Sequence, residues 1–196
     1  MSEEEIIKGC AKHESASQRA LYEIYFPRMM QACTRYAKNQ QEAKEILLDG
    51  FKNIFNFFSS YMNENAKRKK DDTPVSLEEW IKKQILASAI RHMHANKREY
   101  FVSSTVNSRD SERPSSLDTS DEHIMKAADK KIIIKALQQL SPSYRAVYNL
   151  HEVDGYSHQE ISKLLDISEY TSKDSLSKAK FNLRKNLARI VPAAIK

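Results

Sequence analysis

The chain has 196 residues, of which 40% are hydrophobic and 30% charged, and its formal net charge is +6. It contains only three glycines, its apolar residues recur at helical spacing and sustained alternating runs are missing, so the composition excludes a β-rich protein and predicts an all-α fold. No apolar stretch is long enough to span a bilayer, and the acidic start MSEEE does not resemble a signal peptide. We therefore expect a cytoplasmic protein without membrane insertion.

The charges are distributed unevenly along the chain. Residues 1–101 carry 17 basic and 14 acidic side chains, residues 102–122 carry 2 and 5, and residues 123–196 carry 13 and 7. The middle segment holds seven serines and almost no large apolar side chains, so it cannot bury enough surface to offset the entropy of ordering. We predict two small helical domains, residues 1–101 and 123–196, joined by a flexible acidic linker, residues 102–122.

The apolar pattern of the first domain predicts five helices, at residues 3–12, 15–26, 28–38, 40–62 and 76–98. Pro27 should mark a break, because proline is tolerated at a helix start but not inside a helix. The fourth helix has an apolar core stripe made of Leu47, Phe51, Ile54, Phe55 and Phe58. Cys10 and Cys33 stand alone in apolar helical patterns and are predicted to be reduced core residues.

The fifth predicted helix combines an aromatic residue with basic ones. Trp80 stands at its start, and Arg91, Lys97 and Arg98 follow. Aromatic and basic side chains together can hold single-stranded nucleic acid. The alternative is that Trp80 is a core or rim residue, which composition alone favours because large aromatic side chains usually serve packing. The basic run at residues 67–70 is predicted to be a solvated loop.

The second domain is predicted to end in two helices joined by a short polar turn. Upstream of them, one helix should run from about residue 122 to 140, and another should begin with Pro142 and end before a turn at Gly155. Ser157 and Glu160 have the spacing of a capping box at the start of the next helix, and Ser168 is placed to cap the last one. This is a helix-turn-helix.

The last helix has two distinct sides. One stripe is apolar and should face a core, and it consists of Leu176, Ala179, Leu183 and Leu187. The nearly opposite side carries Lys173, Asp174, Ser177 and Lys178. Such a side is often only solvated, but lysine and serine can also contact phosphates and base edges. The polar turn favours DNA binding, as do seven basic residues against the single acid Asp174 between residue 173 and the end.

No catalytic constellation is found in the sequence. The six histidines form no HExxH or similar pair on one helix face, and neither a glycine-rich phosphate loop nor a nucleophile elbow occurs. The sequence predicts no catalytic residue, cofactor or metal site.

The order of these parts resembles an extracytoplasmic-function (ECF) type sigma factor of bacterial RNA polymerase over nearly the whole chain. GYSHQEIS and the helix TSKDSLSKAK resemble the family's region four. YAKNQQEAKEILLDGFKNIF resembles the polymerase-binding helix of region two, and WIKKQILASAIRHMHANKRE resembles the promoter-melting helix.

The resemblance implies a dissociable initiation subunit that binds the RNA polymerase core and promoter DNA, has an anti-sigma factor as a further partner, and is not itself an enzyme. It implies contacts to the −35 duplex by Thr171, Lys173, Asp174, Ser177 and Lys178. It implies contacts to the −10 strand by Trp80, Arg91, His94, Lys97 and Arg98. It implies contacts to the polymerase by Glu45, Leu48 and Asp49.

The chain departs from the family pattern at four of these or neighbouring positions. Leu48 replaces the usual Gln, Ala87 an Asn, Arg91 an Asp, and Asp174 a Ser. We expect Arg91 to contact a backbone phosphate rather than a base, because guanidinium groups at such positions favour phosphates.

An alternative from another class is a helix-turn-helix transcriptional regulator. Such a protein would sense a ligand or partner through its N-terminal domain and would not join the polymerase.

Overall fold

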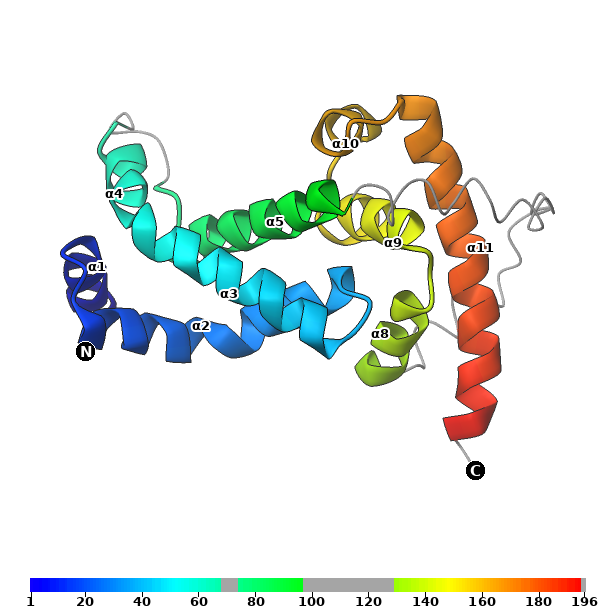
Figure 1. Ribbon diagram of the computed structural model, residues 1–196, viewed down its shortest axis with the longest axis horizontal. Helices are drawn as coiled ribbons and strands as arrows, with labels where there is room; N and C mark the ends of the chain where they lie inside the picture. The colour runs from blue at the N-terminus through cyan, green and yellow to red at the C-terminus, as the bar shows by residue number, and fades with distance from the viewer. Residues whose placement is uncertain (68–73, 97–128, 195–196) are drawn as a thin grey trace. The chain divides into compact units, whose positions relative to one another are not determined.

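The structure, a computed structural model, describes residues 1–67, 74–96 and 129–194. All regular elements among these residues are helices, which confirms the predicted all-α fold (Figure 1). The chain divides into two compact units: residues 1–33 with 40–92, and residues 34–39 with 93 onward. The predicted linker, residues 102–122, lies outside the described residues.

The first unit is built from helices α1 Glu3–Ala11, α2 Ser15–Tyr36, α3 Gln40–Asn56, α4 Phe58–Ala66 and α5 Leu77–Ala95. The last residues of α2 and of α5 belong to the second unit. Their apolar stripes form one core, and α3 lies along both α2 and α5 (Figure 1). Cys10 and Cys33 are buried in this core and reduced, as predicted.

The predicted break at Pro27 is wrong, because α2 continues through this residue. Leu21, Tyr25, Met29 and Cys33 are buried on one side of α2, both before and after the proline. Pro27 itself is exposed on the other side, so the backbone carbonyl that loses its N–H partner can be hydrated. Packing of the continuous apolar stripe outweighs the intrinsic cost of proline in a helix.

The helix predicted over residues 40–62 is divided in two. Phe57 has φ −115° and ψ 22°, which interrupts the helix between α3 and α4. The Phe57 carbonyl oxygen accepts from the Ser60 amide at 2.9 Å and from the Ser60 hydroxyl at 2.7 Å, so both groups of Ser60 bond to it at the start of α4. Phe57 is exposed, whereas Phe58 is buried against Tyr61 and Trp80. The change of direction thus places α4 on the core.

The second unit contains α8 Lys130–Gln138, α9 Pro142–Tyr148, the π-helical segment η2 Asn149–Val153, α10 His158–Leu165 and α11 Glu169–Ala194. The long helix α11 packs against α8, α9 and α10 (Figure 1). Pro142 occupies the first turn of α9, as predicted. The buried Arg145 donates to the Gln138 and Leu140 carbonyl oxygens at 3.1 and 3.3 Å, which satisfies backbone acceptors at the last residue of α8 and just after it.

The sequence did not predict the π-helical segment after α9. In it the Asp154 amide donates to the Asn149 carbonyl oxygen at 2.9 Å, five residues back. Gly155 follows with φ 77°, a left-handed conformation that favours glycine. This geometry turns the chain toward α10.

Candidate nucleic-acid interface

The first helix of the helix-turn-helix begins with a complete capping box. The Glu160 amide donates to the Ser157 hydroxyl at 3.2 Å, and the Ser157 amide donates to the Glu160 carboxylate at 2.8 Å. These two bonds satisfy donors at the start of α10 that have no partner within the helix. The predicted capping box is confirmed.

The turn between α10 and α11 is fixed by backbone conformation and by a second cap. Asp166 has φ 54° and ends α10 in the left-handed region, where aspartate is better tolerated than most residues. The Ile167 amide then donates to the Ser162 carbonyl oxygen at 3.1 Å. At the start of α11 the Thr171 amide donates to the Ser168 hydroxyl at 2.9 Å. The tight polar turn therefore has a defined geometry.

The two predicted sides of α11 are confirmed. The apolar side is buried and consists of Leu176, Ala179, Leu183 and Leu187. Lys173 and Ser177 are exposed on the other side, and Asp174 and Lys178 lie beside them and are partly exposed. An exposed polar side backed by a packed apolar one is the arrangement that a recognition helix needs.

Two predicted −35 residues are bound to each other. The Lys178 ammonium lies 2.9 Å from the Asp174 carboxylate, one helical turn away. This hydrogen bond is the main reason that the pKa of Lys178 is raised above its ordinary value. The pair neutralises the one carboxylate of this surface, which reduces the repulsion that Asp174 would exert on phosphates.

Thr171 serves the fold as well as the surface. Its hydroxyl lies 2.8 Å from the Ser168 hydroxyl, within the cap of α11. A direct contact to a base would require this hydrogen bond to be shared or broken. Thr171 is therefore better placed to fix the start of the helix than to read a base.

Two histidines pack together beside α11. The rings of His151 and His158 are stacked with centroids 4.5 Å apart, and the His158 Nδ1 atom lies 2.9 Å from the buried Ser172 hydroxyl of α11. Burial is the main reason that the pKa of His158 is lowered, and the charges of the nearby His151 and Lys173 lower it further. The sequence did not reveal this contact, because the two histidines lie on either side of the Gly155 turn.

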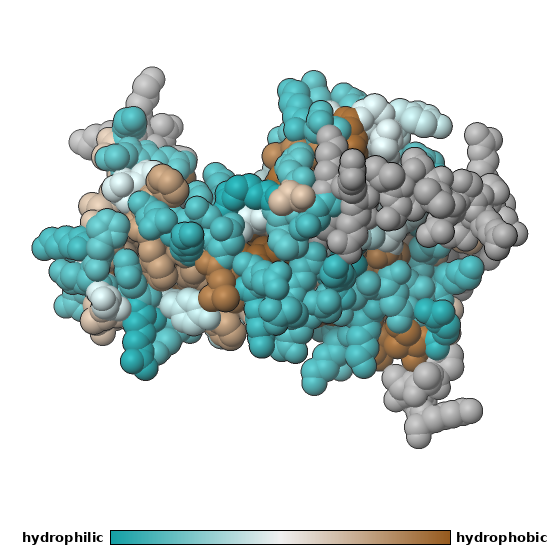
Figure 2. Space-filling view, in the orientation of Figure 1, coloured by the Kyte–Doolittle hydropathy of each residue, from teal (hydrophilic) through white to brown (hydrophobic). Residues whose placement is uncertain are grey.

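Tyr170 is a second residue that sequence reasoning missed. It is 79% exposed at the start of α11. On the face drawn in Figure 2 most atoms are hydrophilic. The signal that could have found Tyr170 is its spacing, since Lys173, Asp174 and Ser177 follow it at three, four and seven residues.

In the first unit, the predicted −10 residue Trp80 is buried, unlike the exposed Lys173 and Ser177 of α11. Trp80 is only 2% exposed, with its ring centroid 5.6 Å from that of Phe58 and 5.5 Å from that of Tyr61. The structure thus contradicts the role of Trp80 as a stacking platform and agrees with the alternative of a core residue. Trp80 lies at the start of α5, and its ring packs against Phe58 and Tyr61 of α4.

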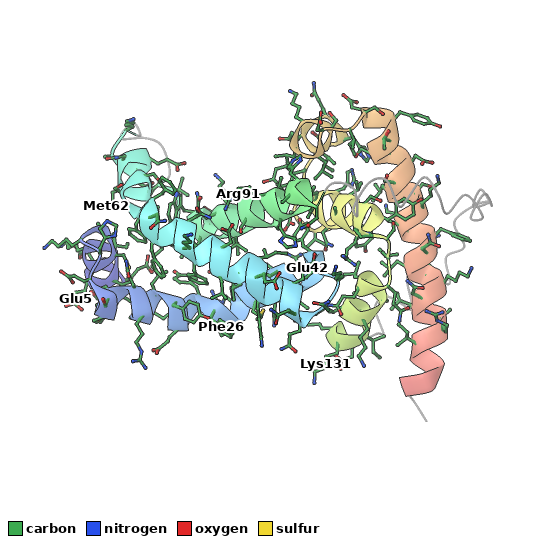
Figure 3. All side chains as sticks on the ribbon, in the orientation of Figure 1. Glu5, Phe26, Glu42, Met62, Arg91 and Lys131 are labelled. Atoms are coloured by element: carbon green, nitrogen blue, oxygen red, sulfur yellow. The ribbon has the colours of Figure 1, made fainter. Side chains whose placement is uncertain are left out.

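Arg91 lies on α5 (Figure 3), with its guanidinium 3.0 Å from the Asp49 carboxylate of α3. The same carboxylate accepts from the Ser88 hydroxyl at 2.5 Å and from the Asn53 amide at 3.3 Å. These hydrogen bonds lower the pKa of Asp49, and the one from Ser88 has the largest effect. Both Arg91 and Asp49 are half exposed, so a phosphate could reach Arg91 only by sharing or replacing Asp49.

The remaining predicted polymerase residues are exposed on α3. Glu45 lies on the surface and accepts from the Gln41 amide at 3.0 Å, and Leu48 is 60% exposed. Asp49 belongs to the same surface but is bound to α5 as well. The structure thus brings the three together on one outward side of α3.

The other predicted residues of the first domain are only partly described. His94 is exposed in the last turn of α5. Lys97 and Arg98 lie outside the described residues, as do residues 68–70 of the basic run. The described part of that run ends at Lys67, which caps α4 and is exposed.

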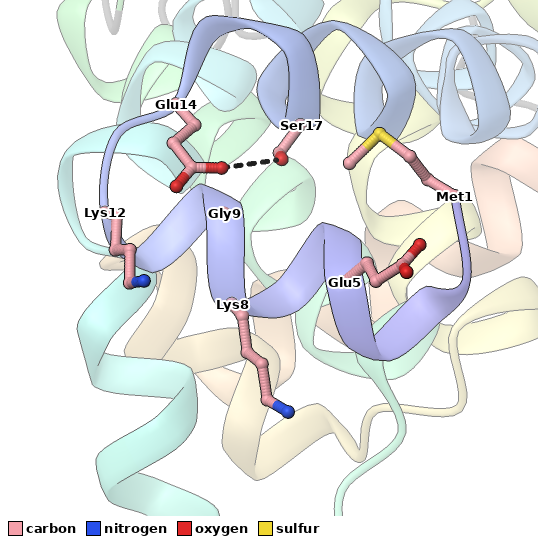
Figure 4. Close-up of a pocket in the computed structure, with 7 residues that line it drawn as sticks. All are labelled: Met1, Glu5, Lys8, Gly9, Lys12, Glu14 and Ser17. Carbon is pink, nitrogen blue, oxygen red and sulfur yellow. Dashed lines mark hydrogen bonds between the residues drawn. The ribbon is translucent and has the colours of Figure 1, made fainter.

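A hollow lies between α1 and the start of α2. It is lined by Met1, Glu5, Lys8, Gly9, Lys12, Glu14 and Ser17 (Figure 4). A Cβ atom on Gly9 would stand 1.9 Å from the Ser17 hydroxyl oxygen, so the close packing of α1 against α2 requires glycine there. In the described part of the chain no group of three His, Cys, Asp or Glu residues is placed to hold a metal ion, and no helix is long and apolar enough to cross a membrane.

Residues 130–181 match the family described as "Sigma-70, region 4". The chain is also similar to a solved structure of the sigma factor RpoE in complex with the anti-sigma factor NepR from Bartonella quintana, with 16% sequence identity, 87% of this chain and 96% of that chain covered, and a TM-score of 0.47. No curated protein matches the chain.

Proposed function

We infer that this chain is a sigma factor of bacterial RNA polymerase, of the ECF type, because its residues 130–181 match sigma-70 region 4. The observation that carries this conclusion is the combination, in the same residues, of the family match and the outward polar side of α11. The chain binds the core polymerase and directs it to promoters. RNA synthesis itself belongs to the core enzyme.

Region 4 carries the duplex-binding part of this function. The exposed side of α11 enters the major groove of the −35 element, as the second helix of a helix-turn-helix does. Lys173 supplies a phosphate contact, because an exposed ammonium gains from counterion release. Ser177 is short, neutral and exposed, so it suits a base edge. The Asp174 carboxylate lies 2.9 Å from the Lys178 ammonium and thereby fixes the orientation of the lysine side chain.

The first domain, residues 1–101, is proposed to be region 2. The exposed Glu45 and Leu48 on α3 support a polymerase contact there. The half-exposed Arg91, which would share or exchange Asp49 for a phosphate, and the exposed His94 support a contact to the separated −10 strand. An arginine in this place binds backbone phosphate more readily than a base edge.

Regulation and location follow from the same proposal. We propose that an anti-sigma factor binds the chain and controls its access to the polymerase. A subunit of bacterial RNA polymerase works in the cytoplasm. The alternative, a regulator that does not join the polymerase, shares the helix-turn-helix but predicts no binding to the core enzyme.

The test begins with the full chain and purified core RNA polymerase. Co-elution of the two in size-exclusion chromatography is expected for a sigma factor. The reconstituted complex should then bind promoter duplexes with an affinity that falls with salt, and Lys173→Ala should reduce the slope of that dependence by about one unit, as the loss of one phosphate contact predicts.

Lys131→Ala is the matched control, since Lys131 is an exposed lysine on α8 and not on the outward side of α11. It should leave the salt slope unchanged. Duplex binding without co-elution would favour the separate regulator. Equal slopes for the parent and Lys173→Ala would show that this side of α11 does not face the DNA.

A further inference from the structure

We propose that Tyr170 reads sequence in the −35 duplex by packing its ring against the methyl group of a thymine in the major groove. This inference rests on the proposed function, in which the start of α11 enters that groove. It adds a residue to the interface that neither the sequence pattern nor the family match assigns.

The exposure of Tyr170 is the first observation behind this assignment. At 79%, its exposed fraction is the largest of any large hydrophobic residue that the structure describes. Single exposed apolar residues are common on protein surfaces and need no special explanation. Tyr170 differs from them in being the second residue of α11. Recognition helices contact base edges with their N-terminal residues, so its ring stands where a base edge is met.

Its neighbours on the helix place Tyr170 on the predicted DNA side. Lys173, Asp174 and Ser177 follow at helical spacing, so all four residues share one face of α11. Tyr170, Asp174 and Lys178 follow one another at four-residue spacing, so Tyr170 lies one helical turn before the Asp174–Lys178 pair.

The polar neighbours of Tyr170 on this side of α11 do not account for recognition of a thymine methyl group. The Thr171 hydroxyl is held in the cap by Ser168 at 2.8 Å, and Asp174 is held by Lys178 at 2.9 Å. Lys173 acts as a point charge, and a serine hydroxyl can bond to either base of a pair. A thymine differs from other bases in the major groove by its methyl group, which only an apolar surface recognises. Among Tyr170, Lys173, Asp174 and Ser177, which share this side of α11, Tyr170 is the residue with an apolar ring.

Tyrosine could instead use its hydroxyl on a phosphate, which would carry no sequence information. The two contacts are separable, because Tyr170→Phe removes the hydroxyl and keeps the ring. Tyr170→Ala removes both. Neither substitution touches the core, since the side chain is exposed, so both variants should fold with unchanged helicity.

The experiment uses the complex of the full chain with core RNA polymerase. Bound duplexes are first selected from a library with a randomised −35 region. The selected duplex is then remade with deoxyuridine in place of each thymine in turn, a change that removes only the methyl group. Affinities are measured for the parent, Tyr170→Ala, Tyr170→Phe and Lys173→Ala.

For the parent we expect one thymine whose replacement lowers affinity roughly fourfold, the effect of exposing one methyl group. Tyr170→Phe should keep this dependence. Tyr170→Ala should bind the thymine duplex more weakly and show no further loss with deoxyuridine at that position. Lys173→Ala should retain the methyl dependence and change the salt slope instead, which separates base reading from phosphate binding.

The assignment is overturned if the parent and Tyr170→Ala respond alike to every deoxyuridine. It is also overturned if Tyr170→Phe loses affinity equally on all duplexes, because the contact would then be a hydroxyl to a phosphate. A parent complex that selects no sequence at all would reject the proposed function. A selective parent with an equally selective Tyr170→Ala variant would reject only the role of Tyr170.

Discussion

The two predicted nucleic-acid surfaces differ in how far the fold leaves their side chains available. On α5, Trp80 is 2% exposed and Arg91 is bound to Asp49 at 3.0 Å. On α11, Lys173 and Ser177 remain exposed. Both helices showed the same combination of apolar and basic residues in the sequence. The same pattern therefore produced a largely structural helix in one unit and an outward surface in the other.

The difference follows from how much of each helix is covered. With 100° of rotation per residue, the buried positions of α5 span an arc of about 220° around its axis, from Trp80 to Met93. Those of α11 span only about 120°, from Ser175 to Leu187. A helix that packs on one side keeps its polar residues outward. A helix covered over more than half its circumference brings polar residues into contact with its neighbours.

The polar contacts between α3 and α5 show the consequence of that coverage. Besides the Arg91–Asp49 pair, His92 lies 3.0 Å from the buried Glu42 carboxylate, which Figure 3 labels on α3. The Ser88 hydroxyl, which has one hydrogen to share between two acceptors, lies 3.0 Å from the Ile46 carbonyl oxygen and 2.5 Å from the Asp49 carboxylate. These groups stabilise the packing of the two helices. A charge pattern therefore identifies a binding surface only where the rest of the fold leaves it uncovered.

The largest expected effect is at Trp80. Tryptophan in a packed aromatic cluster loses about 3–5 kcal/mol of folding free energy when truncated to alanine, so Trp80→Ala should strongly destabilise the first unit. Lys173→Ala on α11 should change stability by less than about 0.5 kcal/mol. Denaturant unfolding of the full chain measures both. A stable Trp80→Ala variant with weakened single-strand binding would reverse the comparison and restore the surface role of Trp80.

The cap of α11 should have the next largest effect on stability. Ser168→Ala removes the acceptor for the Thr171 amide and should cost about 1 kcal/mol. Ser177→Ala is the matched control, because Ser177 is an exposed serine within the same helix. Thermal unfolding of the two variants provides the measurement. Equal unfolding temperatures would show that the cap contributes little to the stability of α11.

The Arg91–Asp49 pair predicts a change in binding rather than in stability. Both side chains are half exposed, so the pair itself contributes at most about 1 kcal/mol. Asp49→Ala should release Arg91 for a phosphate and steepen the salt dependence of single-strand binding by about 0.7 units. The measurement is a salt titration with a fluorescent single-stranded oligonucleotide.

Glu45→Ala is the control for Asp49→Ala, because it removes the same charge from α3 at a carboxylate that is bonded to Gln41 and not to Arg91. If both variants steepen the salt dependence equally, net charge rather than release of Arg91 explains the effect.

The smallest expected effect is a pH dependence of the second unit. The pKa of His158 is lowered in the folded chain, so the unfolded chain binds this proton first as the pH falls. Stability should therefore decrease below about pH 6.5 and level off once the folded imidazole is also protonated. His158→Asn should weaken this dependence, whereas His13→Asn, at an exposed histidine of the first unit, should not. Unfolding temperatures between pH 5 and pH 8 would show parallel curves for the parent and His158→Asn if the stacked histidines were irrelevant.

The sequence predicted most correctly where neighbours along the chain decide the structure. The Ser157–Glu160 capping box, the polar turn and the buried side of α11 were all visible as short spacings. The break at Pro27 was wrong because the propensity of one residue was outweighed by the packing of a whole helix side. The division of the 40–62 helix at Phe57 was missed for a similar reason, since its cause is the packing of α4 on Trp80.

The sequence by itself determined that the chain is helical, where the helix-turn-helix lies and which side of α11 faces outward, because capping and helical periodicity act over a few residues. Only the tertiary structure decided that Trp80 is buried, that Asp49 binds Arg91 and that His158 stacks on His151. Each of these outcomes depends on residues brought together from different helices. Spacing along one helix does not indicate which of its side chains will contact residues of another helix.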